Sequence, residues 1–197
     1  MLVAVTQRVD GVPGRDERRD ALDQRLAAFL GEAGWYAVPV PNLLGELLGA
    51  WLNRVRPAGV VLSGGNDLGA CPERDATERR LLVWAGAMSL PVVGICRGMQ
   101  MLAVHAGGSL RKVSGHVATR HGLLGDVRGE VNSFHQFVLA DVPPGYLVTA
   151  RAPDGVIEAI RHERLPWVGC MWHPEREAPF VAADLTRMGA WLASPPR

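Results

Sequence analysis

The first half of the chain alternates between short apolar runs and longer segments in which apolar side chains recur at helical spacing. The short runs predict buried strands at 2–6, 36–40, 59–62 and 92–95. The longer segments predict amphipathic helices at 20–33, 44–55 and 76–88. Nearly continuous apolar strands that alternate with helices form a parallel sheet covered on both faces. This half therefore predicts an α/β protein with three layers and a mostly parallel central sheet.

The second half has a different pattern. Between residues 109 and 172, short strand-like pieces are separated by glycine and proline, and a last helical pattern follows from about 179 to 192. We expect these pieces to complete the same sheet as β-hairpins. The sequence contains no internal repeat, low-complexity tract or linker, so residues 1–197 are predicted to form a single domain.

Composition narrows the classes of partner. Of the 197 residues, 48% are hydrophobic, which is enough for a real core, and the formal net charge is only +1. A chain with so little net charge has no strong electrostatic field to attract nucleic acid or a membrane surface. The N-terminus has no basic leader, no apolar stretch approaches the roughly 20 residues of a spanning helix, and three cysteines make no disulfide framework. We expect a cytoplasmic protein in which a free thiol persists.

The sharpest motif is Gly94-Ile95-Cys96-Arg97-Gly98, where an apolar strand runs into a helical pattern. Glycines two before and two after a central residue permit the tight turn known as a nucleophile elbow, here with cysteine. Such a turn exposes the sulfur at the carboxyl end of the sheet and at a helix N-terminus, which favours the thiolate. The N–H of Arg97 is then free to face a developing oxyanion. The alternative is a small core cysteine in a tight turn.

A cysteine nucleophile needs a base, which is usually a histidine oriented by a third group. His173 directly follows the apolar run 168–172, so it too emerges at a strand end. Glu175, two residues further on, can bond the distal imidazole nitrogen and fix its tautomer. His-Pro-Glu alone would be an ordinary turn, but together with the elbow it predicts a Cys96, His173 and Glu175 triad.

The other cysteines and histidines have no comparable setting. Cys71 precedes Pro72 in a predicted loop, and Cys170 lies in an apolar run and is expected in the core. The five-residue spacing of His116 and His121 matches no common zinc pattern, and the sequence shows no partner that completes one. We therefore expect no metal, and we interpret these histidines, with His135, as solvated loop residues.

With these residues assembled, the chain resembles the class I glutamine amidotransferase superfamily, in its γ-glutamyl hydrolase branch, almost end to end. Residues 94–100 resemble the nucleophile motif of that branch, and residues 172–175 resemble its base motif, including the tryptophan before the histidine. The resemblance implies a flavodoxin-like three-layer sandwich. It also implies that residues 63–67 supply the second oxyanion donor, the N–H of Gly65.

The same resemblance implies a substrate-binding set. Residues 131–136 look like the substrate-side motif of the family, although the family often has a second histidine where this chain has only one. The implied substrate contacts are Gln100, Ser133, His135 and Gln136.

Some stretches resemble, within the branch, small hydrolases of γ-glutamyl nucleoside-diphosphate amidates. These stretches are 18–24, 65–68, 72–75 and 171–177. Each also has a plain interpretation, since 18–24 could begin a solvated helix and Arg176-Glu177 could be a surface ion pair of little energetic value.

Three functions remain open from the sequence. The favoured one is a stand-alone hydrolase that cleaves a γ-glutamyl amide through a thioester, without a metal or organic cofactor. The second is a glutaminase subunit that supplies ammonia to a synthase partner, and the third is a silent binding module on the same fold. The favoured function implies a small γ-glutamyl substrate as the partner, while a homodimer and a synthase partner are left open.

Overall fold

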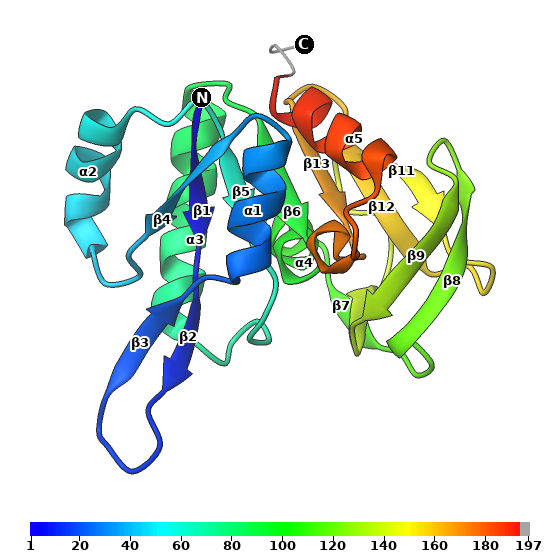
Figure 1. Cartoon of the computed structure of the whole chain (residues 1–197), viewed down its shortest axis with the longest axis horizontal. Coiled ribbons are helices and arrows are strands. Elements are labelled where there is room, and N and C mark those ends of the chain that lie inside the picture. Colours follow the sequence, from blue (N-terminus) through cyan, green and yellow to red (C-terminus); the bar gives the residue numbers. More distant parts are fainter. Residues whose placement is uncertain (194–197) are drawn as a thin grey trace.

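The computed structural model describes residues 1–193 and has a nine-stranded central sheet of order β4-β1-β5-β6-β13-β12-β11-β8-β9 (Figure 1). The first five strands in this order are parallel to one another. They are β4 (Tyr36–Val40), β1 (Leu2–Thr6), β5 (Val60–Leu62), β6 (Val92–Ile95) and β13 (Trp167–Cys170). Their carboxyl ends meet at one edge of the sheet, where open α/β sheets bind ligands. The predicted α/β sandwich is confirmed.

The other half of the sheet is antiparallel, as the sequence predicted for its hairpins. Its strands are β12 (Ile157–His162), β11 (Tyr146–Arg151), β8 (Val117–Gly125) and β9 (Gly129–Phe134). The separate pair β7 (Leu110–Lys112) and β10 (Phe137–Leu139) brings the segment after β9 back beside the helix that follows β6.

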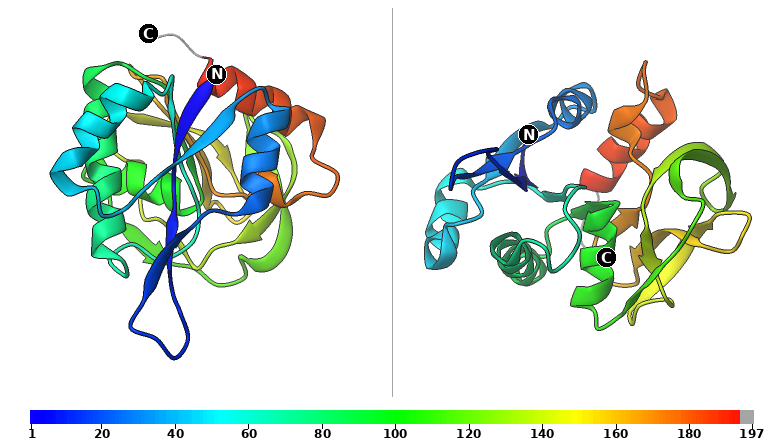
Figure 2. Two further views of the ribbon diagram at one scale, coloured as in Figure 1. Left: turned by 60° about the vertical axis from the view of Figure 1, so that its left-hand side comes forward. Right: turned by 90° about the horizontal axis from the view of Figure 1, so that it is seen from below.

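Helices cover both faces of the sheet (Figure 2). One face carries α1 (Gln24–Glu32) and α5 (Ala182–Leu192), whose buried side chains include Phe29, Leu30 and Met188. The opposite face carries α2 (Leu48–Val55), α3 (Pro72–Ala87) and α4 (Arg97–His105). Two short 3-10 turns, η1 (Gly45–Leu47) and η2 (Pro174–Arg176), precede α2 and follow β13. None of the helices in residues 1–193 is long and apolar enough to span a bilayer.

The predicted helix at 20–33 is wrong in its first turn. The first residues of that segment belong instead to the strand β3 (Arg18–Ala21). This strand pairs with β2 (Arg8–Gly11) in a hairpin that projects from the body of the molecule in Figure 1. The helix begins only after Asp23, whose carboxylate accepts a hydrogen bond from the N–H of Arg25 at 2.8 Å and so caps the first turn. The same finding excludes the idea that 18–24 begins a solvated helix.

Helix α3 begins at Pro72, four residues earlier than the predicted start at Ala76. Its buried face includes three charged side chains, those of Arg74, Asp75 and Glu78, so the usual apolar periodicity is hidden. Proline is favoured in the first turn because its missing N–H has no helical partner there.

Candidate active site

Cys96 occupies a sharp turn between β6 and α4. Its backbone has φ 51° and ψ −104°, a conformation that non-glycine residues rarely adopt, and its N–H donates to the carbonyl of Cys170 at 2.7 Å. Both flanking glycines are required by packing. A Cβ on Gly94 would lie 2.5 Å from the carbonyl carbon of Gly98, and a Cβ on Gly98 would lie 2.1 Å from the carbonyl oxygen of Leu62. The turn therefore has the geometry expected of an elbow.

His173 emerges from β13, the sheet neighbour of β6, at the same edge of the sheet. Its Nδ1 lies 2.7 Å from Oε1 of Glu175, and both side chains are almost fully buried. Burial lowers the pKa of His173, but its contacts with Cys96 and Glu175 outweigh this and raise the pKa to about 9. The fold thus brings together the three residues that the sequence pairs only by pattern.

Asn132, which the sequence did not single out, positions the backbone of His173. Its side-chain Nδ2 donates to the carbonyl of His173 at 2.8 Å, and its Oδ1 accepts from the N–H of His173 at 2.9 Å. The carboxylate of Glu177 accepts a further bond from Nδ2 at 2.8 Å. The available signal for this role was a buried asparagine on a strand next to the base. Its partner can be identified only once the position of β9 in the fold is known.

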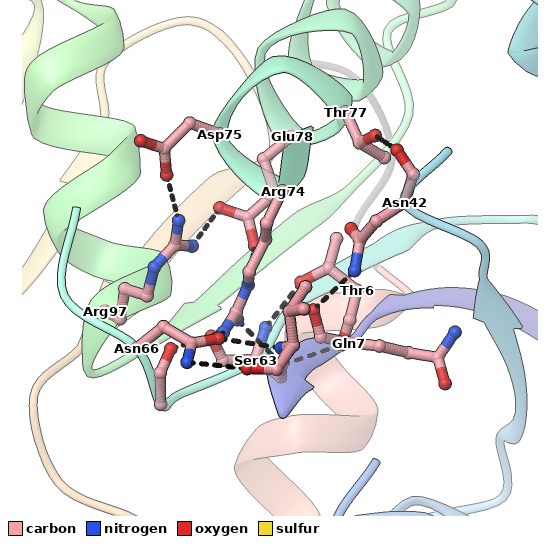
Figure 3. Close-up of polar contacts among 12 residues, drawn as sticks. Thr6, Gln7, Asn42, Ser63, Asn66, Arg74, Asp75, Thr77, Glu78 and Arg97 are labelled. Atoms are coloured by element: carbon pink, nitrogen blue, oxygen red, sulfur yellow. Dashed lines mark hydrogen bonds and ion pairs between the residues drawn. The ribbon is translucent and has the colours of Figure 1, made fainter. Parts of the chain in front are cut away.

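Arg74 holds the loop that follows β5 (Figure 3). Its fully buried guanidinium donates to the carbonyls of Ser63 at 2.7 Å and Gly64 at 3.1 Å, and also to that of Gly65. In a trans peptide the carbonyl and the next N–H point in opposite directions. Because the Gly64 carbonyl faces Arg74, the N–H of Gly65 faces away from it. Gly65 itself lines a pocket together with Cys96.

The side chain of Arg97 is turned away from that pocket. Its guanidinium is buried and forms ion pairs with Asp75 and Glu78, and Glu78 also accepts from Nε of Arg74 at 3.0 Å. Two arginines and two carboxylates on α3 and α4 thus share one buried network, visible in Figure 3. Only the backbone of Arg97, at the N-terminus of α4, is free for an oxyanion.

The pocket beside Cys96 has a volume of about 150 Å³. Among the residues implied as substrate contacts, Gln100, His135 and Gln136 line it, and Arg176 forms another part of its wall. The side-chain nitrogen of Gln100 donates to the carbonyl of Phe137 at 2.8 Å, which leaves its oxygen for other contacts. A larger hollow of about 230 Å³ near the end of α5 contains none of these side chains.

One residue does not lie where the resemblance implied. Ser133 is fully buried and is not part of the pocket lining, because its hydroxyl donates to the carbonyl of His116 at 2.8 Å. The expected contact between Ser133 and substrate therefore does not fit. Trp172, the tryptophan of the base motif, is buried and packs in the core with α5.

The prediction of solvated loop histidines is wrong. His116 and His135 are almost fully buried, and His121 is half-buried on β8. All three lie around the buried carboxylate of Glu158, which β12 brings from a distant part of the chain. Burial, followed by the neighbouring His116 and His121, lowers the pKa of His135 to about 3. The prediction for Cys170 is confirmed, since it lies fully buried in β13.

Comparison with solved structures shows that the fold is that of glutamine amidotransferases. The structure superposes on a glutamine amidotransferase from Thermotoga maritima with a TM-score of 0.67, over 91% of this chain and 78% of that chain, at 20% identity. The chain belongs to the Peptidase C26 family, which it matches over residues 2–122 and 115–175.

Curated relatives divide between two activities. The chain is 32% identical to a gamma-glutamyl-CDP-amidate hydrolase of Campylobacter jejuni over 124 residues, which span 60% of this chain and 62% of that protein, less than two thirds of its length. It is 32% identical to a gamma-glutamyl-gamma-aminobutyrate hydrolase of Escherichia coli O157:H7, over 71% of this chain and 70% of that protein. It is 31% identical to a glutamine-hydrolyzing GMP synthase subunit of Methanopyrus kandleri, over 71% of this chain and 78% of that protein.

Proposed function

We propose that this protein is a cysteine-dependent hydrolase that cleaves the γ-glutamyl amide bond of a small compound and releases glutamate. The observation that carries the proposal is the position of Cys96, which sits at a strained strand–helix turn in contact with an imidazole that Glu175 holds at 2.7 Å. A thiol paired with an oriented histidine at a helix N-terminus is the arrangement of an activated nucleophile.

The first half of the reaction forms a thioester. The Cys96 thiolate attacks the γ-carbonyl carbon, and the N–H groups of Gly65 and Arg97 hold the resulting oxyanion, each worth about 3 kcal/mol in related acyl transfer. Protonated His173 donates its proton to the amide nitrogen. The C–N bond breaks, the amine leaves, and a γ-glutamyl thioester remains on Cys96.

Water completes the second half. Neutral His173 takes a proton from the attacking water, and the new oxyanion occupies the same two N–H groups. The C–S bond breaks, glutamate leaves, and the thiolate with protonated His173 is restored. A histidine with a pKa raised to about 9 by its partners holds its proton at neutral pH, as the first half requires.

We further propose that the substrate carries a polar or anionic group beyond the scissile nitrogen, as in a γ-glutamyl nucleoside-diphosphate amidate. The buried ion pairs of Arg97 leave Arg176 as the more available arginine at the pocket, since its one ion pair in the described chain is a long contact of 3.9 Å between its Nε and Oε1 of Glu175. The Arg176 side chain is 36% exposed and its guanidinium lies 4.7 Å from the ring centre of Phe134, at the mouth of the pocket. The similarity to the gamma-glutamyl-CDP-amidate hydrolase supports the same chemistry.

The second candidate is a glutaminase subunit that supplies ammonia to a synthase partner. The similarity to the GMP synthase subunit of Methanopyrus kandleri is the observation that favours it, since that relative is covered over 78% of its length. The two functions differ in the best substrate and in the need for a second protein.

The deciding experiment measures kcat/KM of the isolated chain for glutamine, a γ-glutamyl alkylamine and a γ-glutamyl phosphoramidate, with glutamate release as the readout. We expect the phosphoramidate to exceed glutamine at least tenfold, which needs only about 1.4 kcal/mol of additional contact. Cys96→Ser should release no glutamate from any of them. Arg176→Gln should lower kcat/KM for the phosphoramidate by a larger factor than for glutamine. If glutamine is the best substrate, or all are inert without a second protein, the ammonia-supplying function is correct.

A further inference from the structure

A buried group of three histidines and one glutamate lies behind the wall of the pocket. His116 precedes β8, His121 lies on β8, His135 follows β9, and Glu158 lies on β12. The side chains of His116, His135 and Glu158 are at most 5% exposed, and that of His121 is 12% exposed. Residues from three separate segments of the chain thus direct their metal-ligating side chains to one point in the interior.

The ligand atoms of His116, His135 and Glu158 all lie within 4.8 Å of one another, and His121 approaches this group through Glu158. Nε2 of His135 lies 3.1 Å from Nδ1 of His116, and the same two atoms lie 3.6 and 3.5 Å from Oε1 of Glu158. Nε2 of His121 lies 3.4 Å from that oxygen. Ligand atoms around a tetrahedral zinc ion with bonds of about 2.0–2.1 Å are about 3.3–3.4 Å apart.

The group is poorly satisfied by the protein alone. Within residues 1–193, neither carboxylate oxygen of Glu158 has a hydrogen-bond donor, although the side chain is fully buried. Nε2 of His121 and Nδ1 of His135 are also buried there without a hydrogen-bond partner. A buried carboxylate is costly unless a cation or hydrogen bonds compensate for it.

A second carboxylate supports His116 from outside the group. Oδ2 of Asp154 lies 2.9 Å from Nε2 of His116 and can accept its proton, which leaves Nδ1 unprotonated and directed at the other three residues. Metal-binding histidines commonly donate their other ring N–H to a carboxylate in this way.

We propose that His116 Nδ1, His135 Nε2 and Glu158 Oε1, with His121 Nε2 as the fourth ligand, bind a zinc ion. Three imidazoles and a carboxylate, with only His121 partly exposed, make a four-ligand site suited to a structural ion, with no position left for substrate. The five-residue spacing of His116 and His121 did not predict it because the remaining ligands come from other strands.

The site would fix the substrate-side wall. His135 belongs both to the zinc group and to the pocket lining, and its N–H donates to the carbonyl of His116 at 3.0 Å. The hydroxyl of Ser133 donates to the same carbonyl at 2.8 Å. An ion that ties β12 to residues 133–136 therefore holds one side of the pocket in place, and it takes part in no step of the reaction proposed above.

The test is the zinc content of the full-length chain without a histidine tag, stripped with a chelator, reloaded with zinc and desalted. We expect about one zinc per chain, measured by mass spectrometry of the metal, and less than about a fifth of this in Glu158→Gln and in His135→Gln. His121→Gln should weaken zinc binding less. His105→Gln, which changes a histidine outside the group, should keep the full content, and circular dichroism should show that each variant is folded.

Cobalt distinguishes this site from the Cys96 thiol without relying on a variant that could misfold. The parent chain should give the visible absorption of tetrahedral cobalt and no thiolate-to-cobalt charge-transfer band, and Cys96→Ser should bind one zinc as the parent does. The proposal is overturned if the parent retains no zinc, if Glu158→Gln and His135→Gln retain it, or if Cys96→Ser loses it. Because the readout is metal content, it is independent of the proposed hydrolase activity.

Discussion

Oε1 of Glu175 lies 2.7 Å from Nδ1 of His173, at the distance of a strong charge-assisted hydrogen bond. The partner oxygen, Oε2, has no hydrogen-bond partner within residues 1–193, and the nearest cation, Nε of Arg176, lies 3.9 Å from Oε1, so the imidazole is the short contact of this carboxylate. This bond sets the tautomer of His173 and leaves its Nε2 for the thiol.

Replacing Glu175 with Gln should change the pH dependence of catalysis. The contact with Glu175 is one of the causes that raise the pKa of His173 to about 9, so its loss lowers that pKa. Thioester formation needs the proton on His173. In the parent, the single-turnover release of the amine should therefore fall as the pH rises through about 9, and in Glu175→Gln it should fall at a lower pH. We also expect a loss of kcat on the order of 10²-fold, with little change in substrate binding.

The matched control for Glu175→Gln is Glu46→Gln, because Glu46 is exposed and pairs with Arg80 away from the base. Its pH profile should coincide with that of the parent. A Glu175→Gln profile that also coincided with the parent would remove Glu175 from the proposed triad.

Cys96 should be the thiol that iodoacetamide alkylates fastest near neutral pH. It lies at the N-terminus of α4 and contacts His173, a setting typical of reactive cysteines. Burial raises the pKa of Cys170 well above its ordinary value, and that side chain is fully enclosed. Peptide mapping after brief exposure identifies the modified residue. Faster labelling of Cys71 or Cys170 would contradict the assignment of the nucleophile.

Gly64→Ala should impair catalysis by displacing the base. A Cβ at this position would lie 2.6 Å from Cε1 of His173, closer than any real contact, so the imidazole must move. A displacement of about 1 Å can cost on the order of 10²-fold in rate, which we expect in kcat/KM. The control is Gly49→Ala, at a glycine on α2 where a Cβ meets nothing within 4 Å. Equal kcat/KM in the parent and in Gly64→Ala would show that the base tolerates the methyl group.

Arg74→Met should destabilise the fold and the loop after β5 together. The substitution removes the donor for three consecutive carbonyls and leaves Glu78 with Arg97 as its only ion-pair partner in the described chain. Breaking a buried pair of this kind costs about 3–5 kcal/mol, which urea unfolding measures. Arg79→Met, at the exposed neighbouring arginine, should change the free energy of unfolding by less than about 0.5 kcal/mol. Similar midpoints for the two variants would argue against the network.

The parallel half of the fold could be predicted because each of its strands is a short apolar run. The strands at 2–6, 36–40 and 92–95 have the predicted bounds, and Cys96 and His173 both emerge at the shared edge. The rule that ligands bind at the carboxyl ends of parallel strands was enough to bring the nucleophile and the base together from the sequence alone.

Other features could not be predicted because they depend on contacts between residues that lie far apart in the sequence. Arg74 lies before the predicted start of its helix, and nothing in the local sequence shows that the loop carbonyls face it. The histidine group needs Glu158, which reaches it only because β12 pairs with β13 and β11. Ser133 is turned from the pocket because neighbouring strand residues face opposite sides, and its register could not be fixed from a motif.

The hairpin of β2 and β3 forms its ladder only with itself and is joined to the loop beside Cys96 at its base, where Asn66 bonds both backbone groups of Val9 at 2.8 and 3.1 Å. Its tip can therefore lengthen or shorten during evolution without breaking a hydrogen bond of the central sheet. A substitution at Val9 or Asn66 would instead disturb the backbone directly after Gly65. A change in the length of this hairpin would thus reshape the surface beside the pocket while the residues around Cys96 keep their places.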